Sequence, residues 1–502
     1  MDSQALLIRA DGSPQIGTGH VMRCLALAQA WRVSTSGPIV FVTAMDTPAL
    51  EARLHAEGAQ VVRLSTPPGS MEDARQTTAL AQQYRASWIV ADGYHFGAEY
   101  QNLLKAGEFQ LLVIDDYGHT KQYSADMILN QNLHASEHLY TNRQSHTRLL
   151  LGTRYMLLRR EFVQQGPPVR TIPAVAHRVL VTLGGSDPEN VTAKVIQALR
   201  QRQCEGLEAT VVIGGSNPHV EHIHTLLGGT PDFIQLEHNV TDIPEDMRQA
   251  DIAISAAGST AWELAFMGLP SLLIVTAKNQ RPIATHLAQS GATINLGWHN
   301  TCTPSDIVTA LEKLRTSAEV RRTMSQCGQT LIDGNGAARV VMAMTGDTLR
   351  LRNVREGDSH LLWEWANDPD ARAVSFSSDS IPWEEHLEWF HAKVQSPRCL
   401  FFIATDSEDV PVGQVRFDLT NDEAIISVSL DRHQRSKGYG IRLLRLSAQA
   451  LFTVTHLSTI HAYVKPNNHA SLRTFAKAGY THGGTTVTAG QPAVHFILRR
   501  SL

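Results

Sequence analysis

The stretch ALLIRADG at residues 5–12, followed at residues 16–23 by IGTGHVMR, decides the fold of the N-terminal part. Residues 5–10 are a short apolar run of the length of a buried strand, and glycines then open a turn. From Val21 to Trp31 apolar residues recur at helical spacing. A strand that passes through a glycine turn into a helix is the first half of a βαβ unit.

The residues that follow repeat this pattern. Apolar strands are predicted at 38–43, 87–91 and 111–114, with helical stretches between them. Strands that alternate with helices form a parallel sheet covered by helices on both faces. The sequence therefore predicts a doubly wound α/β domain.

A second series of the same kind begins after a break near residues 164–168. Strands predicted at 178–183, 209–213 and 251–255 each run into a turn rich in glycine or small residues. This order predicts a second doubly wound domain, and two such domains joined by a proline-containing linker leave a cleft between them.

The pattern changes again near residues 333–336 and 345–347. Several tryptophans follow, and strands with polar-apolar alternation are predicted at 401–405, 411–419, 424–430 and 458–464. Such alternation is typical of an antiparallel sheet in an α+β domain. We therefore predict three domains, at residues 1–165, 174–344 and 347–502.

Composition narrows the class of protein. The 502 residues are 43% hydrophobic and 18% charged, with a net charge of -4 and no long run of one sign. A nucleic-acid-binding role, which usually needs a basic face, is therefore not expected. No apolar run approaches the roughly 20 residues of a membrane span, and the N-terminus lacks the pattern of a signal peptide. The sequence leaves protein partners open.

The cysteines stand singly, without a CxxC pair or a cluster of metal ligands, which is typical of reduced thiols in a cytoplasmic protein. They are Cys24, Cys204, Cys302, Cys327 and Cys399. No carboxylate cluster in the sequence indicates a bound metal. The expected class is a cytoplasmic enzyme that acts on small molecules.

The first glycine turn carries a candidate catalytic residue. Glycines before a helix let the backbone approach an anion, and amides at the helix start favour negative charge. His20 stands at that helix entrance, where a neutral imidazole can deprotonate water. From spacing alone, a tight structural turn with His20 as a partly solvated cap is an equally good interpretation.

The N-terminal 340 residues resemble the UDP-sugar hydrolases of pseudaminic acid biosynthesis, relatives of the two-domain GT-B glycosyltransferases. Beyond residues 9–23, the resemblance rests on VIDDY at 113–117, ILNQN at 128–132, GTRYMLLRREF at 152–162, VTLGGSDP at 181–188 and AGSTAWE at 257–263. It implies hydrolysis of the glycosidic bond to UDP, with anomeric inversion. The products are UDP and free 2,4-diacetamido-2,4,6-trideoxy-altropyranose, a precursor in flagellin glycosylation.

The same resemblance implies roles for residues of the first domain. His20 corresponds to the general base or water-positioning residue, and Gly17 and Gly19 let the loop approach the phosphates. Asp11 and Tyr94 correspond to residues near the sugar. Without the resemblance, Asp11 is equally well a turn cap and Tyr94 the end of a strand.

The second domain is implied to hold UDP. Glu263 matches a glutamate that binds the ribose hydroxyls, a task suited to a carboxylate that accepts two hydrogen bonds. The remaining implied contacts to the nucleotide sugar are Arg23, Gly258, Ser259, Thr260, Asn279 and Gln280, with amides and cations meeting the leaving-group charge. Without the resemblance, Glu263 is an acid favoured by the helix dipole. A GT-B glycosyltransferase stays an alternative, because the fold is shared.

The third domain resembles the GNAT acetyltransferases. The segments that carry this resemblance are LWEWANDP at 362–369, QRSKGYG at 434–440 and VKPNNHASLRTFAKAGY at 464–480. It implies acetyl-CoA as cosubstrate, with the pyrophosphate held by backbone amides at a helix start. The implied coenzyme contacts are Leu430, Gln434, Arg435, Lys437, Gly438, Gly440, Asn468 and Ser471. For Asn468, a helix N-cap is nearly as good an interpretation.

One position departs from the GNAT pattern. Many GNAT enzymes have a tyrosine at the position of Phe475, and its hydroxyl protonates the departing thiolate. Phe475 cannot donate a proton, so water, Tyr463 or Tyr480 takes that role, or the domain is a module without acetyl transfer. If it is active, the two resemblances together imply N-acetylation of a 4-amino UDP-sugar followed by release of UDP.

Overall fold

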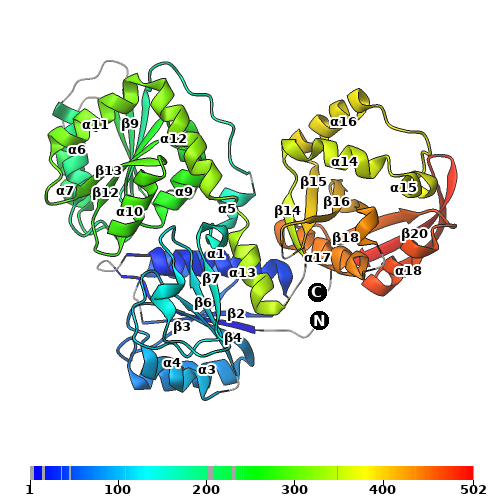
Figure 1. Cartoon of the computed structure of the whole chain (residues 1–502), viewed down its shortest axis with the longest axis horizontal. Coiled ribbons are helices and arrows are strands. Elements are labelled where there is room, and N and C mark those ends of the chain that lie inside the picture. The colour runs from blue at the N-terminus through cyan, green and yellow to red at the C-terminus, as the bar shows by residue number, and fades with distance from the viewer. Residues whose placement is uncertain are drawn as a thin grey trace. The chain divides into compact units, whose positions relative to one another are not determined.

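The computed structural model describes residues 5–13, 17–35, 37–44, 47–107, 109–164, 166–201, 207–228, 233–238, 240, 242–346, 349–406, 408–435 and 437–500. Of the residues named above, Ile16, Cys204 and Ser436 lie outside these ranges, as do the domain limits predicted at residues 1, 165, 347 and 502. The chain divides into two compact units (Figure 1). The first extends to Val340 and holds two parallel sheets, and the second consists mainly of Val341–Leu502.

The first sheet is parallel, and its described strands follow the order β3-β2-β1-β4-β5-β6-β7. Its strands are β1 (Ala5–Ala10), β2 (Ile39–Thr43), β3 (Gln60–Arg63), β4 (Ala86–Asp92), β5 (Gln110–Ile114), β6 (Met127–Asn130) and β7 (Arg148–Leu151). The helices of this part are α1 (Gly19–Ser34), α2 (Pro48–Ala56), α3 (Met71–Gln83), α4 (Ala98–Lys105), η1 (Glu137–Tyr140), η2 (Thr153–Tyr155) and α5 (Arg160–Val163).

Burial explains why these elements form. Every residue of β1 is buried, as expected of a parallel strand covered on both faces. Helix α1 buries residues around most of its circumference, including the fully buried Trp31. A helix that is apolar on nearly all sides belongs in the interior. The N-terminal apolar segments therefore build the centre of the first sheet and the helix on it.

The second sheet is also parallel, with its described strands in the order β10-β9-β8-β11-β12-β13. Its strands are β8 (Arg178–Thr182), β9 (Glu208–Ile213), β10 (Ile234–His238), β11 (Ile252–Ala256), β12 (Ser271–Val275) and β13 (Thr293–Trp298). The helices are α6 (Val191–Gln201), α7 (Val220–Leu227), α8 (Ile243–Gln249), α9 (Thr260–Phe266), α10 (Gln280–Gln289), α11 (Pro304–Thr316), α12 (Ala318–Leu331) and α13 (Gly336–Thr345).

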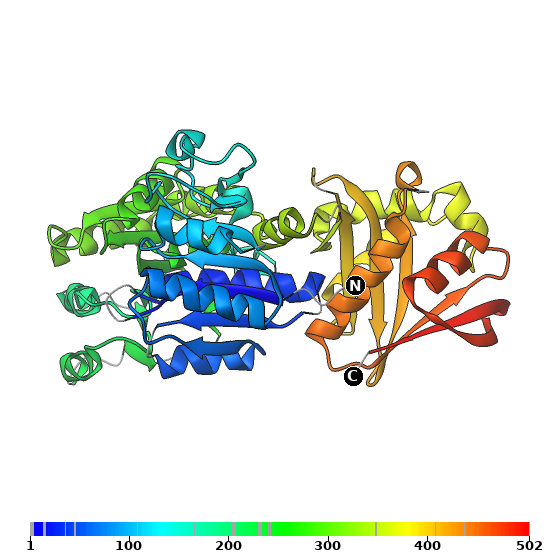
Figure 2. The same cartoon turned by 90° about the horizontal axis from the view of Figure 1, so that it is seen from below.

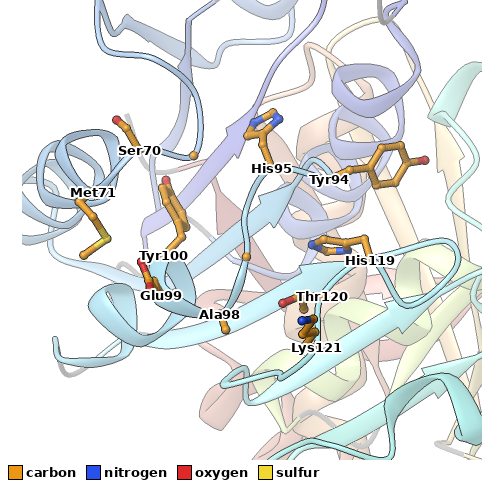
Figure 3. A pocket seen from close by; sticks show the side chains of 12 residues that line it. Ser70, Met71, Tyr94, His95, Ala98, Glu99, Tyr100, His119, Thr120 and Lys121 are labelled. Atoms are coloured by element: carbon orange, nitrogen blue, oxygen red, sulfur yellow. The ribbon is translucent and has the colours of Figure 1, made fainter.

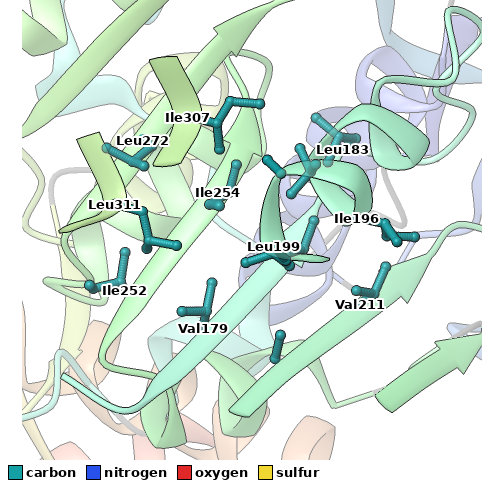
Figure 4. Packing of buried hydrophobic residues seen from close by; sticks show 14 of the residues in the cluster. Val179, Leu183, Ile196, Leu199, Val211, Ile252, Ile254, Leu272, Ile307 and Leu311 are labelled. Carbon is teal, nitrogen blue, oxygen red and sulfur yellow. The ribbon is translucent and has the colours of Figure 1, made fainter. Parts of the chain in front are cut away.

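Helix α11 covers part of this second sheet. It begins at a capping box in which Thr303 and Asp306 satisfy each other's backbone amides. Ile307 and Leu311 then point onto the strands, where they join the same apolar cluster as Ile254 (Figure 4). The cap fixes where the helix starts, and its apolar stripe fixes which face is buried.

The third sheet belongs to the second unit. Its described strands follow the order β14-β15-β16-β17-β18-β20-β19, antiparallel except for the parallel pair β17 and β18. The strands are β14 (Arg350–Asn353), β15 (Cys399–Thr405), β16 (Pro411–Leu419), β17 (Glu423–Leu430), β18 (Thr459–Val464), β19 (Thr481–Thr488) and β20 (Gln491–Arg499). The helices are η3 (Glu356–Asp358), α14 (Ser359–Ala366), α15 (Pro369–Val374), α16 (Trp383–Gln395), η4 (Arg432–Gln434), α17 (Tyr439–Val454) and α18 (His469–Ala478).

The two faces of this third sheet carry different clusters. Figure 2 shows α17, in orange, lying along one face, and its buried leucines pack with Phe475 of α18 and with Val415 and Ile460. A separate cluster joins α14, α16 and β15. The predicted fold class, two doubly wound parallel α/β domains followed by an α+β domain, is confirmed.

The predicted domain limits stay predictions, but one helix near them has clear contacts. Arg339 of α13 donates a hydrogen bond of 2.7 Å to the carbonyl of Arg154, and a side chain at Gly336 would overlap the backbone of Met156. The start of α13 therefore packs on residues that precede the second sheet in sequence. In the described part of the chain, no helix combines the length and apolar character needed to cross a membrane.

Candidate functional site

Both parallel sheets reverse their strand order at one point, and ligands of open α/β sheets bind outside the carboxyl ends of the strands at such points. In the first sheet the reversal lies between β1 and β4, and in the second between β8 and β11. Asp11 directly follows β1, and Asp92 ends β4. His20 lies in the first turn of α1, next to this reversal.

His20 is held by a buried carboxylate. Its Nδ1 lies 2.7 Å from Oδ1 of Asp92, which is fully buried. Burial alone would raise the pKa of Asp92, but the charges of Arg23 and His20 lower it, so the carboxylate stays ionised. An ionised carboxylate needs a donor, and Nδ1 therefore carries the proton. That tautomer leaves Nε2 as an acceptor able to take a proton from water.

Arg23 lies beneath this pair and is 8% exposed. Its Nε and Nη2 donate to Asp92 at 2.7 Å, and its Nη1 donates to Asp116 at 2.8 Å. The phosphate contact predicted for Arg23 stays a prediction. In the structure its guanidinium donates hydrogen bonds to the carboxylates of Asp92 and Asp116 and so fixes their positions.

Tyr94 connects the two parallel sheets. Its hydroxyl donates to Asp116 at 2.6 Å and accepts from Nδ2 of Asn279 at 3.0 Å. Burial, together with the charge of Asp116, raises the pKa of Tyr94, so the hydroxyl remains protonated. Its ring meets the His20 ring edge-on at 5.0 Å. Two residues predicted from separate segments, Tyr94 and Asn279, are thus in direct contact.

Asp11 is tied mainly to its own part of the chain. It accepts from Arg9 and from the amide of Ala44, each at 2.7 Å, and its second oxygen lies 3.4 Å from Nε2 of His95. Burial opposes ionisation, but the contacts with His95 and Arg9 lower the pKa of Asp11. His95 lines a cavity of about 580 Å³, and Figure 3 shows that the adjacent Tyr94 points in another direction. Both Tyr94 and His95 line the cavity, and Asp11 contacts one of these two lining residues, His95.

The second sheet brings its own small-residue turns to the same place. A Cβ at Gly19 would lie 3.5 Å from Oγ of Ser259, and one at Gly17 would lie 3.9 Å from Oγ of Ser186. A Cβ at Gly185 would lie only 2.5 Å from Oγ1 of Thr18. The glycines thus permit a close approach between the turns that follow β1, β8 and β11.

Glu263 of α9 is paired with a cation from the first part of the chain. Nη2 of Arg159 donates to its carboxylate at 2.9 Å. Burial raises the pKa of Glu263, and the charge of Arg159 counteracts this rise. Gly258 and Ser259 form the turn before α9, which begins at Thr260. Gln280 begins α10, and its side-chain Nε2 lies 3.7 Å from the position of a Cβ at Gly258. A small cleft is lined by Met22, Arg23, Gln131, Met156, Leu157, Arg159, Ser259, Trp262 and Glu263.

The second unit carries a separate glycine loop between β17 and α17. Gly438 is the N-cap of α17 and has φ +84°, a left-handed conformation that favours glycine. A Cβ built there meets nothing within 4 Å, so the space above the helix start is open. Gly440 instead packs closely on Thr474 of α18, where a Cβ would lie 3.0 Å away. The loop therefore leaves backbone amides of α17 accessible to an anion.

Side chains near this loop are held by local contacts. Arg435 donates to Asp368 at 2.8 Å and to Asp370 at 3.2 Å, and Lys437 donates to Gln434 at 3.1 Å. Leu430, the last residue of β17, accepts from Arg435 through its carbonyl. The loop thus contacts α15 through Arg435, while Gly438 has no side chain over it.

Asn468 and Ser471 lie at the start of α18. The side chain of Asn468 accepts from the amide of Ser471 at 3.1 Å, which makes it the N-cap of the helix. Phe475, further along α18, is 4% exposed and meets the ring of Tyr480 edge-on at 5.1 Å. Among the described contacts the Tyr480 hydroxyl has no hydrogen-bond partner, and burial raises its pKa.

Two sequence families cover the later parts of the chain. Residues 348–481 match the acetyltransferase (GNAT) domain, and residues 179–339 match the glycosyltransferase family 28 C-terminal domain. Aminoglycoside N(6')-acetyltransferase type 1 of Klebsiella pneumoniae is 33% identical over 184 residues, which is 87% of that protein and 32% of this chain. The C-terminal domain belongs to the GNAT acetyltransferase family.

Other relatives extend the similarity beyond this GNAT domain. UDP-2,4-diacetamido-2,4,6-trideoxy-beta-L-altropyranose hydrolase of Campylobacter jejuni is 24% identical over 296 residues, 97% of that protein and 57% of this chain. The uncharacterized protein MJ1062 of Methanocaldococcus jannaschii is 21% identical over 494 residues, 96% of that protein and 95% of this chain. The chain therefore joins a part similar to a UDP-sugar hydrolase to a GNAT acetyltransferase domain.

The crystal structure of MurG from Acinetobacter baumannii covers 68% of the chain, with a TM-score of 0.46 and 13% identity. Among the residues that the structure describes, no group of three or more His, Cys, Asp or Glu side chains could hold a metal ion.

Sequence reasoning missed Asp92, Asp116 and Arg159. Asp92 lies 72 residues from its partner His20, and Arg159 lies 104 residues from Glu263. A usable signal existed for the two aspartates, because Asp92 directly follows the strand predicted at 87–91 and Asp116 comes two residues after the strand predicted at 111–114, at the carboxyl ends where ligands bind. For Arg159 the only signal is its place in a segment shared with the hydrolases.

Proposed function

We propose that the chain is a bifunctional enzyme of pseudaminic acid biosynthesis. The first unit hydrolyses UDP-2,4-diacetamido-2,4,6-trideoxy-beta-L-altropyranose to UDP and the free sugar, with inversion at the anomeric carbon. The GNAT domain N-acetylates the 4-amino UDP-sugar precursor with acetyl-CoA. We assign both activities to the cytoplasm, in keeping with single cysteines and no disulfide among the described residues.

The observation that carries the hydrolase proposal is the His20–Asp92 pair next to the turns of the second sheet. Nε2 of His20 accepts a proton from water as the water oxygen attacks the anomeric carbon. The bond from that carbon to the diphosphate oxygen breaks, and UDP leaves with the electron pair. Asp92 keeps the imidazole in the accepting tautomer and stabilises the imidazolium that forms.

The nucleotide is held by the second sheet. Glu263 accepts hydrogen bonds from the two ribose hydroxyls, and amides of the turn at residues 258–260 bind the diphosphate. Nδ2 of Asn279 donates to the Tyr94 hydroxyl at 3.0 Å and so connects the two sheets. We assign the sugar to a position beside this contact. Arg23 acts as a positioning residue, because its donors are taken by Asp92 and Asp116. Asp11 acts through His95.

Acetyl transfer takes place in the GNAT domain. The open turn at Gly438 and the start of α17 bind the coenzyme A pyrophosphate. The neutral 4-amino group attacks the thioester carbon, the carbon–sulfur bond breaks, and the thiolate is protonated to coenzyme A. The acetylated sugar is then the substrate for hydrolysis, so one product feeds the next reaction.

A single experiment tests both activities. The purified chain is incubated with the 4-amino UDP-sugar, with and without acetyl-CoA, and products are followed by mass spectrometry. We expect acetylated UDP-sugar, then UDP and free diacetamido sugar, only when acetyl-CoA is present. Hydrolysis of supplied UDP-diacetamido sugar without acetylation would leave the GNAT domain as a binding module. No release of UDP from either sugar would refute the hydrolase.

A glycosyltransferase is the second candidate, because residues 179–339 match a glycosyltransferase family. A transferase releases UDP only when a sugar acceptor is present, whereas a hydrolase needs only water. UDP release from the purified chain in buffer alone, with incorporation of ¹⁸O from labelled water into the free sugar, separates the two.

A further inference from the structure

Two neighbouring parallel strands of the GNAT domain separate beside the glycine loop that we assign to coenzyme A. β17 and β18 are parallel, but they pair only at Glu423–Ile425 with Thr459–His461. Beyond that point the strands separate, and β17 leads directly into the glycine loop of α17. His461 pairs with Ile425 at the last paired position of the two strands, so it lies where the gap between them begins.

Alternation along the strands places His461 on the face away from α17 and α18. Ile460 and Ala462 are buried in the cluster that contains Phe475. Because successive side chains point to opposite faces, His461 and Tyr463 share the other face. β20 pairs antiparallel with β18 and sets His495 opposite Tyr463.

On that face three titratable groups are linked in a row. Oε2 of Glu423 lies 3.1 Å from Nε2 of His461, and Nδ1 of His461 lies 2.7 Å from Nε2 of His495. The Tyr463 ring stacks on His495, with ring centroids 5.0 Å apart. The His461 side chain is only 13% exposed, whereas the Glu423 side chain is 54% exposed. The row therefore leads from a mostly buried imidazole to a carboxylate in contact with solvent.

The proton positions in this row are assigned from the charge of the Glu423 carboxylate and from the hydrogen bond between the two histidines. Nε2 of His461 faces the Glu423 carboxylate at 3.1 Å without an aligned hydrogen bond. Because a negative charge favours a proton on the nitrogen nearest to it, we infer that Nε2 of His461 carries the proton and that Nδ1 is an acceptor. Nε2 of His495 must then donate, and its Nδ1 carries the free electron pair. A Cβ at Gly483 would lie 2.9 Å from this Nδ1, so any residue other than glycine at this position would crowd that atom.

The surroundings of His495 keep it neutral and ready to accept a proton. Burial lowers the pKa of His495, and the neighbouring His461 lowers it further. His482, on β19, acts in the same direction, while Glu423 opposes them. An imidazole that is neutral at physiological pH is suited to general-base catalysis.

We propose that His495 is the general base of acetyl transfer, and that His461 and Glu423 form a relay that passes the proton toward solvent. As the amine nitrogen attacks the thioester carbon, its proton moves to Nδ1 of His495. The Nε2 proton of His495 passes to Nδ1 of His461, and the Nε2 proton of His461 passes to Glu423. The carbon–sulfur bond breaks, and the thiolate takes a separate proton. This inference rests on the proposed acetyl transfer.

The test compares His495→Gln, His495→Ala and Glu423→Gln with wild type, in the full-length chain with acetyl-CoA and the 4-amino UDP-sugar. We expect kcat/KM for acetyl transfer to fall roughly 10²–10⁴-fold in His495→Gln. Its pH profile should lose the imidazole inflection, and free imidazole should restore part of the activity of His495→Ala. Coenzyme A binding and UDP-sugar hydrolysis should not change. The exposed His456 supplies the matched control variant, His456→Gln.

A second readout does not depend on the acceptor. Ring ¹⁵N spectra of histidine-labelled protein should show His461 and His495 as neutral Nε2–H tautomers. If wild type acetylates kanamycin or spermine but not the amino sugar, the acceptor assignment fails and the variants are tested with those amines. If no amine is acetylated, the ¹⁵N spectra test the proposal by showing whether His495 carries its proton on Nε2. An unchanged pH profile in His495→Gln, or a His495 protonated only at Nδ1, would overturn the proposal.

Discussion

At the scale of single residues, the charge of the Asp92 carboxylate determines which ring nitrogen of His20 carries the proton. Asp92 is fully buried, and its carboxylate lies 2.7 Å from both Nδ1 of His20 and Nε of Arg23. The cation beneath the carboxylate keeps it ionised, so it orients the imidazole without becoming protonated. The ionised carboxylate therefore keeps Nδ1 of His20 directed at Asp92.

Replacement of His20 is expected to stop hydrolysis while sparing nucleotide binding. His20→Ala should lower kcat for UDP-sugar hydrolysis by roughly 10²–10⁴-fold, the usual contribution of a positioned base. The Kd for UDP, measured by calorimetry, should stay within a factor of two. His138, an exposed histidine of the same unit, supplies the control His138→Ala. Equal activity of His20→Ala and His138→Ala would remove His20 from the mechanism.

Asp92→Asn tests orientation separately from the base itself. The amide cannot hold the Nδ1–H tautomer in the same way, and Arg23 loses half of its compensating charge. We expect hydrolysis to fall with little change in KM, and the melting temperature of the first unit to drop, because a buried charge is left partly unpaired. Full activity with an unchanged melting temperature would show that the 2.7 Å contact has no role.

Glu263 is predicted to determine affinity for the nucleotide. Glu263→Gln keeps the size of the side chain but weakens charge-assisted hydrogen bonds, which contribute about 1.5–3 kcal/mol each. The Kd for UDP should therefore rise roughly 10- to 100-fold in calorimetry. Glu245→Gln is the control, since Glu245 lies on the surface beside Arg248. A Kd unchanged in Glu263→Gln would assign ribose binding to another residue.

At the scale of elements, apolar runs predicted the central strands well and the edges poorly. The strand predicted at residues 411–419 coincides with β16. The edge strands β3 and β19 were not predicted, because they show no continuous apolar pattern. The interior strands β6 and β20 were also missed. The fold class could be predicted because central parallel strands are buried on both faces.

The candidate site was only half predictable for the same reason. Glycine turns and His20 are local signals, visible within one short segment. The partners Asp92 and Asp116 depend on which strands are neighbours, and strand order is a property of the assembled sheet. The arrangement of Glu423, His461 and His495 likewise needs the pairing of β17, β18 and β20.

The turn at Gly438 yields a prediction about the coenzyme. Gly438→Ala forces an L residue into φ +84° and places a methyl group over the start of α17. The strain costs about 1–2 kcal/mol, and the methyl group should raise the Kd for coenzyme A at least tenfold. Gly490→Ala is a matched control, because Gly490 also has a positive φ, +73°, and no atom within 4 Å of its Cβ position. Similar Kd values in both variants would contradict the loop assignment.

At the scale of the whole molecule, acid should destabilise the first unit. Burial alone would raise the pKa of Asp115, but contacts led by His119 lower it to about 2, and Arg339 lowers that of Asp333 to about 2. A carboxyl whose folded pKa lies below its unfolded value stabilises the protein above that unfolded value. This stabilisation is lost as pH falls through the folded pKa.

Calorimetry from pH 7 to pH 2 should therefore show the melting temperature of the first unit falling steeply below pH 4. Asp333→Asn removes one contributing group, so it should lower stability at pH 7 and flatten the decline at acid pH. A melting temperature independent of pH between 4 and 2 would contradict these shifts.

The position of α13 decides where the chain can be divided. Arg339 bonds the carbonyl of Arg154 and the carboxylate of Asp333, and Ala337 is buried. A fragment of residues 1–346 keeps these contacts, whereas a fragment of residues 1–335 loses them and exposes the backbone at Met156. We expect the shorter fragment to be less stable by roughly 3 kcal/mol, because the Arg339 guanidinium loses its hydrogen bonds to both Arg154 and Asp333. Urea unfolding measures the difference, and hydrolysis by the longer fragment alone would show that the first unit needs no other part of the chain.

Equal stability of the two fragments would mean that α13 contributes nothing to the first unit, and the boundary would then move to residue 335.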